Sequence, residues 1–207
     1  MRVITGSARG RRLGELKGME TRPTTDKVKE SIFNCIQFDV EDARVLDLFA
    51  GTGQLGIEAL SRGAKSALFV DKRADAVKLV RENLALCHLE ENAQIICGDS
   101  LAALGTQSGR FDIIFLDPPY DTEFSTYAKN TFGQADQQRL AIYLKNECPC
   151  FFMLIIKKTP FVEALYPNGI AVHGGRKLCV SEFSKKYFVS FQNRNDKDAS
   201  HLLITNY

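Results

Sequence analysis

Residues 45–53, with the sequence Val45-Leu46-Asp47-Leu48-Phe49-Ala50-Gly51-Thr52-Gly53, decide the fold of this 207-residue chain. The stretch begins as an apolar run of strand length, and a helical pattern follows it at 55–60. Glycines in a strand-to-helix turn let the backbone approach a ligand closely, because glycine has no side chain. In an open α/β sheet, such a turn lies at the carboxyl end of a strand, where ligands bind.

The chain beyond this turn continues to alternate strands and helices. Apolar runs and helical spacing predict strands at 66–70, 94–97, 111–116 and 151–156, and helices at 73–86 and 134–146. Because the strands are nearly continuous apolar runs, we expect both faces of the sheet to be covered. The sequence therefore predicts an α/β fold with a mostly parallel, doubly wound, Rossmann-like sheet.

The two flanks differ from this core. Glycine-punctuated turns and short strands predict a basic N-terminal extension over residues 1–20, followed by a main domain over 21–207 that begins with a helix near Asp26. Near the other end, two apolar runs flank a polar turn, which predicts an antiparallel hairpin with strands at 186–191 and 201–205.

The composition excludes several classes of protein. Hydrophobic residues make up 44% of the chain and charged residues 25%, a balance that excludes a disordered or fibrous chain. No apolar run reaches the ~18 residues of a membrane span, and the first residues lack the apolar core of a signal peptide. The six cysteines form no CxxC pair, so we expect reduced, mostly buried thiols and no metal site. These features predict a cytoplasmic monomer with no membrane partner.

Positive charge is concentrated at the start of the chain. The net charge is only +2, but residues 1–25 carry six basic side chains against two acidic ones. Such a segment attracts the phosphates of a nucleic acid, although a solvated surface has the same pattern. The candidate phosphate-binding residues are Arg9, Arg11, Arg12 and Arg22.

Acidic residues lie at the ends of three predicted strands. Asp47 precedes the glycines, where a carboxylate can reach the amino group of S-adenosylmethionine, and Asp71 is placed to accept from both ribose hydroxyls. Asp99 can accept from an adenine amino group, although an aspartate there is more often a helix cap. The predicted cofactor-binding residues are Asp47, Gly51, Gly53, Asp71, Asp99 and Ser100.

The same turn leaves a second cofactor open. Residues 51–56 also fit the GxGxxG pattern of dinucleotide-binding proteins, and Asp71 would serve NAD equally well. An NAD-dependent oxidoreductase is therefore an alternative, although Phe49-Ala50 fills the turn where a pyrophosphate loop more often has glycine.

The tetrapeptide Asp117-Pro118-Pro119-Tyr120 follows the run at 111–116 and favours S-adenosylmethionine. An exocyclic amine of a nucleobase is a poor nucleophile because its lone pair is delocalised into the ring. The Asp117 carboxylate and the Pro118 carbonyl could accept from its two N–H groups, with Pro119 fixing the backbone and Tyr120 stacking on the base. All four residues are candidate catalytic residues for methyl transfer to such an amine.

The first part of the chain resembles the RsmD family of 16S rRNA guanine-N2 methyltransferases. The similarity covers residues 1–120. It is carried by five stretches in addition to the glycine turn and the tetrapeptide: Arg2-Val3-Ile4-Thr5-Gly6, Arg9-Gly10-Arg11, residues 21–28 (TRPTTDKV), residues 32–34 (IFN) and residues 58–63 (EALSRG). The resemblance implies a class I methyltransferase fold, S-adenosylmethionine as cofactor, and an N-terminal extension that helps to hold rRNA.

The last part resembles Dam-type DNA adenine-N6 methyltransferases. The similar stretches begin at the tetrapeptide and include residues 124–127 (FSTY), 136–141 (DQQRLA) and the tail 201–207 (HLLITNY). The N-terminal cofactor motif and the target-recognition insert of that family are absent. We therefore expect an RNA guanine as target, with a DNA adenine as the alternative. A nucleic-acid-binding module that holds the cofactor without turnover is a third hypothesis.

Overall fold

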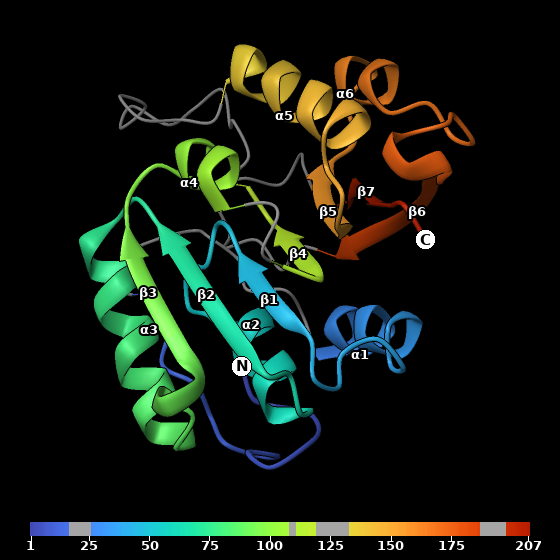
Figure 1. Ribbon diagram of the computed structural model, residues 1–207. Helices are drawn as coiled ribbons and strands as arrows, with labels where there is room; N and C mark the ends of the chain where they lie inside the picture. Colours follow the sequence, from blue (N-terminus) through green and yellow to red (C-terminus); the bar gives the residue numbers. More distant parts are fainter. Residues whose placement is uncertain (17–25, 108–110, 119–132, 187–197) are drawn as a thin grey trace, which may run out of the picture. The chain divides into compact units, whose positions relative to one another are not determined.

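The computed structural model describes residues 1–16, 26–107, 111–118, 133–186 and 198–207 (Figure 1). The chain forms two compact units, Met1–Phe115 and Leu116–Tyr207. The predicted division into residues 1–20 and 21–207 falls in a stretch outside the described residues, so it stays a prediction.

The first unit is built on a parallel sheet. Its strands are β1 (Arg44–Asp47), β2 (Ser66–Asp71), β3 (Ala93–Cys97) and β4 (Ile113–Leu116), in the order β3-β2-β1-β4. Every pair in this sheet is parallel, so the carboxyl ends of the strands meet at one edge. The chain leaves β3 at one side and returns beside β1, and in α/β folds ligands bind where strand order changes in this way.

The helices of this unit connect its strands. They are α1 (Asp26–Cys35), α2 (Gln54–Ser61), α3 (Ala74–Cys87) and α4 (Ser100–Gln107), with a short 3₁₀ turn at Glu90–Asn92. Every residue of α2 is buried, and α2 packs against β1 and β2 while α3 packs against β2 and β3. All four residues of β4 are buried too. Because successive side chains of a strand point to opposite faces, both faces are covered there, as the apolar runs predict.

One glycine sets the distance between α2 and the sheet. A Cβ atom at Gly56 would lie 2.3 Å from the ring of Phe69 on β2, a distance that real Cβ atoms essentially never show. The close approach of α2 to β2 therefore requires glycine at this position.

The second unit contains an antiparallel sheet in the order β5-β7-β6. Its elements are α5 (Gln134–Asn146), β5 (Phe151–Lys157), α6 (Pro160–Leu165), a 3₁₀ turn at His173–Gly175, β6 (Cys179–Lys186) and β7 (Asp198–Thr205). The buried side chain of Asn206 joins the end of β7 to the start of β5. Its Oδ1 accepts from the Phe152 N–H at 2.9 Å, and its Nδ2 donates to the Cys150 carbonyl at 2.9 Å.

The predicted C-terminal antiparallel hairpin is confirmed by the pairing of β6 with β7. The described part of its first strand is β6, at 179–186, while the predicted range 186–191 lies outside the described residues except for Lys186, the last residue of β6. Residues 179–185 were not predicted as strand because β6 is an edge strand with exposed positions such as Ser181 and Glu182, so it needs no continuous apolar run.

Two other expectations concern the burial of the cysteines and the presence of membrane-spanning helices. All six cysteines are free, but Cys35, Cys97 and Cys179 are exposed, so the expectation of mostly buried thiols is wrong. Within the described ranges, no helix combines the length and the apolar character that crossing a bilayer requires.

The N-terminal segment, residues 1–14, folds back on itself as a tight hairpin. The Val3 N–H donates to the Arg11 carbonyl at 3.0 Å, and the Leu13 N–H donates to the Met1 carbonyl at 3.2 Å. Gly6, with φ +88°, lies so close to α2 that a Cβ atom there would be 1.6 Å from the Ser61 carbonyl oxygen. The backbone of the segment is therefore pressed directly onto α2.

A buried carboxylate holds this segment in place. Glu58 on α2 is fully buried and accepts from the N–H groups of Ile4 and Thr5, at 2.8 and 3.0 Å. It also forms ion pairs with Lys29 at 3.2 Å and with Arg62 at 2.9 Å. Burial lowers the pKa of Lys29, and the charge of Glu58 opposes that shift. Each carboxylate oxygen of Glu58 thus receives two donors, which compensates for its removal from water.

We predict that Glu58→Gln destabilises the protein by about 3 kcal/mol or more, because the amide would turn an N–H group toward donors and leave the buried Lys29 uncompensated. Urea unfolding measures the difference. The control is Glu82→Gln, which removes an exposed carboxylate 3.9 Å from Lys78 and should change the free energy of unfolding by no more than about 0.5 kcal/mol. Equal losses in the two variants would contradict the assignment.

Candidate methyl-donor site

The glycine turn joins the end of β1 to the start of α2. Gly51 and Gly53 both have positive φ angles, 53° and 76°, in the left-handed region that favours glycine. Gly53 is the N-cap of α2, and the Ala50 N–H donates to the Val70 carbonyl of β2 at 3.1 Å. The turn is therefore fixed against the carboxyl ends of two neighbouring strands.

Two of the predicted carboxylates brace this turn. Asp71 accepts at Oδ2 from the Gly51 N–H at 2.8 Å and at Oδ1 from the Arg73 N–H at 2.9 Å. Asp47 is buried and accepts at Oδ2 from the Gly56 N–H at 3.0 Å. A carboxylate oxygen has two lone pairs, so the half-buried Asp71 keeps acceptor capacity for a ligand hydroxyl.

Asp99 and Ser100 follow the third strand of this edge. Asp99 accepts at Oδ1 from the Ala102 N–H at 2.9 Å, so it caps α4, a role that suits an aspartate before a helix. The residue is exposed, and one carboxylate oxygen does not take part in this bond. The buried hydroxyl of Ser100 donates to the Leu48 carbonyl at 3.5 Å, which ties the start of α4 to the end of β1. Asp47, Gly51, Gly53, Asp71, Asp99 and Ser100 thus lie along one edge of the first unit.

The predicted catalytic tetrapeptide is described only in its first half. Asp117 directly follows β4 and is half-buried, and Pro118 is buried. Pro119 and Tyr120 lie outside the described residues, as does Arg22. The roles of these residues stay predictions.

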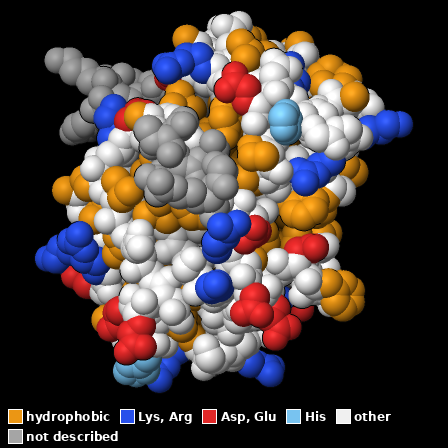
Figure 2. Space-filling model, in the orientation of Figure 1, with side chains coloured by type: hydrophobic (Ala, Val, Ile, Leu, Met, Phe, Trp, Pro, Cys, Tyr) orange, Lys and Arg blue, Asp and Glu red, His pale blue; other side chains and the backbone are white. Residues whose placement is uncertain are grey.

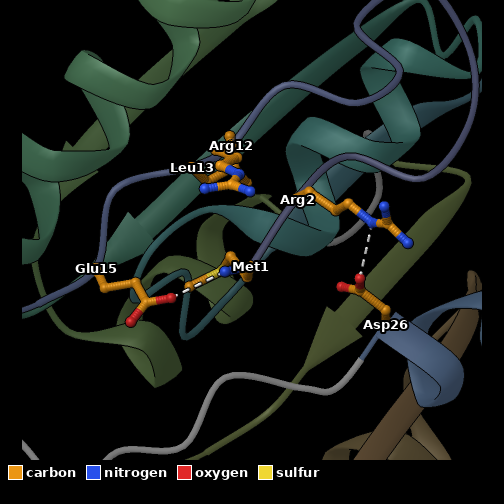
Figure 3. A pocket seen from close by; sticks show the side chains of 6 residues that line it. All are labelled: Met1, Arg2, Arg12, Leu13, Glu15 and Asp26. Carbon is orange, nitrogen blue, oxygen red and sulfur yellow. Dashed lines mark hydrogen bonds and ion pairs between the residues drawn. The ribbon is translucent and has the colours of Figure 1, made fainter.

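The predicted phosphate-binding arginines lie on the N-terminal segment. Arg9, Arg11 and Arg12 are exposed, and Arg12 lines an open pocket together with Met1, Arg2, Leu13, Glu15 and Asp26 (Figure 3). In this pocket, the Arg2 guanidinium pairs with Asp26 at 3.0 Å and the amino group of Met1 pairs with Glu15 at 2.8 Å. Arg12 forms no ion pair with any residue that the structure describes. On the face shown in Figure 2, basic side chains are spread among acidic ones and form no separate patch.

Three buried polar residues near this site were missed by sequence reasoning. They are Lys29, Glu58 and Asn83. Asn83 is 2% exposed on α3, where its amide contacts both the N-terminal segment and the glycine turn. The available signal is a polar residue inside an apolar stripe, since Asn83 continues the helical spacing of Ala76 and Val80.

Comparison with solved structures agrees with this architecture. An Escherichia coli structure named "Putative methyltransferase yhhF" superposes with a TM-score of 0.62 and 25% sequence identity, covering 100% of this chain and 97% of that one. A structure from Pyrococcus horikoshii, described as a methyltransferase for RNA, has a TM-score of 0.63 at 19% identity, which supports the fold alone. The fold and the similarity to the Escherichia coli structure define a class I methyltransferase of the α/β type, which confirms the predicted fold class.

The sequence comparisons identify the family of methyltransferases to which the chain belongs. The family model described as Conserved hypothetical protein 95 matches residues 1–142, so the chain belongs to this family, the RsmD family of methyltransferases. "Putative rRNA methyltransferase YlbH" of Bacillus subtilis is 52% identical over 123 residues, which are 58% of this chain and 67% of that protein. "Ribosomal RNA small subunit methyltransferase D" of Haemophilus influenzae is 40% identical over 123 residues, or 58% of this chain and 64% of that protein.

The chain spans about two thirds of the curated relatives that it matches, or somewhat less. The resemblance of residues 117–207 to Dam-type enzymes is not tested by these matches and stays a prediction.

Proposed function

We propose that this chain is an S-adenosylmethionine-dependent methyltransferase that acts on the exocyclic N2 amino group of a guanine in 16S rRNA. Membership of the RsmD family supports the reaction class, and relatives named for the small-subunit ribosomal RNA support the substrate class. The observation that carries the proposal is the glycine turn held by Asp71 at the edge of the parallel sheet.

The turn has the chemistry of a cofactor site. Gly51 and Gly53 have positive φ and carry no side chains, so a ligand can approach the backbone there. Because α2 begins directly after them, its first N–H groups lie at the same edge. The free lone pairs of Asp71 suit a pair of ribose hydroxyls, and the carboxylate oxygen of Asp99 outside its capping bond suits an amino group on the adenine ring. S-adenosylmethionine supplies an electrophilic methyl group on a sulfonium when it is bound.

The residues after β4 would activate the amine. The Asp117 carboxylate and the Pro118 carbonyl accept hydrogen bonds from the two N–H groups, which frees the nitrogen lone pair for attack. The bound sulfonium would supply the methyl group to this nitrogen, and Asp117 or water would take the proton that the nitrogen releases. Tyr120 would provide a ring on which the extruded base stacks. Alignment of the amine with the methyl group supplies the remaining rate enhancement.

The N-terminal segment would hold the RNA backbone. Arg9, Arg11 and Arg12 are exposed on a hairpin whose own backbone is fixed to α2, so their charges are presented at defined positions. Contacts of this kind orient a nucleic acid without reading its sequence.

A DNA adenine-N6 methyltransferase is the second candidate, because residues 117–207 resemble Dam-type enzymes. The deciding experiment incubates the chain with tritiated S-adenosylmethionine and either 16S rRNA, small-subunit particles or DNA, and identifies the methylated nucleoside after digestion. N2-methylguanosine in the RNA supports the proposal. N6-methyladenine in DNA favours the alternative, and cofactor binding without transfer to any substrate favours a binding module.

We predict that Asp71→Ala weakens S-adenosylmethionine binding at least about tenfold, because the variant loses both the ribose acceptor and the brace of Gly51. Titration calorimetry measures the affinity. Asp39→Ala removes an exposed aspartate elsewhere on the first unit and should leave the affinity unchanged. Binding of NADH instead of S-adenosylmethionine by the unmodified chain would refute the cofactor assignment.

We predict that Asp117→Ala abolishes methyl transfer while cofactor affinity stays near that of the unmodified chain, because Asp117 is assigned to the amine and not to the cofactor. The tritium assay and calorimetry on the same preparation separate the two effects. Retained turnover would remove Asp117 from the mechanism.

We predict that the double variant Arg11→Glu/Arg12→Glu binds 16S rRNA more weakly and with a flatter dependence on salt concentration, because each lost phosphate contact lowers the salt slope by about one. Lys65→Glu/Lys177→Glu changes the net charge equally at exposed positions outside the N-terminal segment and serves as the control. A salt slope that matches the unmodified chain would assign the arginines to solubility alone.

A further inference from the structure

The buried side chain of Asn83 joins the glycine turn to the N-terminal segment. Asn83 donates from Nδ2 to the carbonyl of Thr52, the residue between Gly51 and Gly53, at 2.9 Å. The same amide accepts at Oδ1 from the N–H of Gly14 at 2.7 Å, and Nδ2 lies 3.4 Å from the Gly14 carbonyl. One side chain on α3 therefore contacts the backbone of both segments.

Only one orientation of the Asn83 amide satisfies both of its backbone partners. The Gly14 N–H requires an oxygen and the Thr52 carbonyl requires an N–H group, so a rotated amide would oppose like groups on both sides. Asn83 is 2% exposed, so its amide has little access to water that could replace a lost partner. A displacement of Gly14 is thus transmitted through the amide to Thr52, or it leaves a buried polar group without its bond.

Packing around the link is tight enough to transmit such a displacement. A Cβ atom at Gly14 would lie 2.9 Å from Leu79 Cδ1 and 3.3 Å from Asn83 Oδ1, so the segment lies directly against α3. A second contact reaches the same turn residue from the other end of the segment, where the Thr52 hydroxyl donates to Met1 Sδ at 3.4 Å. Both contacts arrive at the one non-glycine residue of the turn Gly51-Thr52-Gly53.

We propose that Asn83 is a positioning residue that couples the N-terminal segment to the glycine turn, so that RNA bound to the segment raises the affinity of the turn for S-adenosylmethionine. This inference rests on the proposed function, because it assigns the cofactor to the turn and the RNA to the segment. Coupling of this kind is reciprocal, so the cofactor raises the affinity for RNA by the same factor. The enzyme would then favour the complex that holds both substrates over either partial complex.

The test uses a substitution that removes the bond to Thr52 and keeps the shorter of the two bonds to Gly14. Asn83→Asp keeps an acceptor for the Gly14 N–H but loses the donor to the Thr52 carbonyl, together with the longer, 3.4 Å contact to the Gly14 carbonyl. Ser61→Ala is the matched control: the Ser61 hydroxyl accepts from the Ala8 N–H at 3.0 Å and donates to the Thr5 carbonyl at 2.6 Å, at the opposite end of α2 from the turn. The control loosens the same segment without touching Thr52.

The measurement is the affinity for S-adenosylhomocysteine, determined by calorimetry with and without 16S rRNA transcribed in vitro. In the unmodified chain, RNA should tighten this binding about fivefold or more. In Asn83→Asp, the affinity without RNA should fall about tenfold and RNA should no longer change it. In Ser61→Ala, both quantities should stay within about twofold of the unmodified chain.

Each other outcome counts against the inference. An unchanged affinity and RNA effect in Asn83→Asp would overturn it while leaving the proposed function intact, and so would equal losses in Ser61→Ala and Asn83→Asp, or the absence of any RNA effect in the unmodified chain. If the unmodified chain binds no S-adenosylhomocysteine, the proposed function itself fails.

A second variant guards against unfolding of the first. If thermal unfolding shows that Asn83→Asp is not folded, Gly14→Ala takes its place, because it displaces the segment from Asn83 while both partners of the Thr52 bond remain. It should lose the RNA effect, and retention of that effect would overturn the inference.

Discussion

The rest of the first unit depends on the hydrogen bonds and ion pairs that the buried carboxylate of Glu58 accepts. It brings the backbone of residues 4 and 5, the ammonium of Lys29 and the guanidinium of Arg62 to one point inside the protein. A group of this kind is stable without water only when all its partners are present, so it specifies one arrangement of three chain segments. Because Glu58 lies on α2, the N-terminal segment is fixed to the helix that begins at the glycine turn.

This arrangement explains how a short basic segment can contribute to a site built on a sheet. Arg9, Arg11 and Arg12 would be a mobile cationic tail if the hairpin were not pressed onto α2. The contacts of Gly6 with Ser61, and of Gly14 with α3, hold its backbone close to the fold at two points. A fixed segment loses little conformational entropy on binding a ligand, and it can pass a displacement to its neighbours.

Most of the fold could be predicted from the sequence, because apolar period and glycine placement act locally. The strands from β1 to β5, the helices α2, α3 and α5, and the turn at Gly51 all agree with those patterns. The first seven residues of the edge strand β6 were not predicted, since edge strands need no apolar run, and α4 was anticipated only through Asp99. The short helix α6 was not predicted.

The site residues divide in the same way, into those that the local sequence identifies and those whose roles depend on partners far along the chain. Asp71 was selected by its position after a strand, and the structure adds that it also braces Gly51. Lys29, Glu58 and Asn83 were not selected, because their roles depend on partners between 27 and 69 residues away along the chain. Only a polar residue within an apolar helical stripe marks such positions, and that signal does not name the partner.

The position of β7 has a consequence for how the chain is made. This strand is the last one along the chain, yet it lies between β5 and β6. A ribosome completes all four strands of the parallel sheet long before β7 emerges, so the first unit can fold while the second is still being synthesised. Until β7 arrives, β5 and β6 lack the strand that pairs with both, and their open edges are the surfaces on which a nascent chain is most exposed to aggregation and to chaperones.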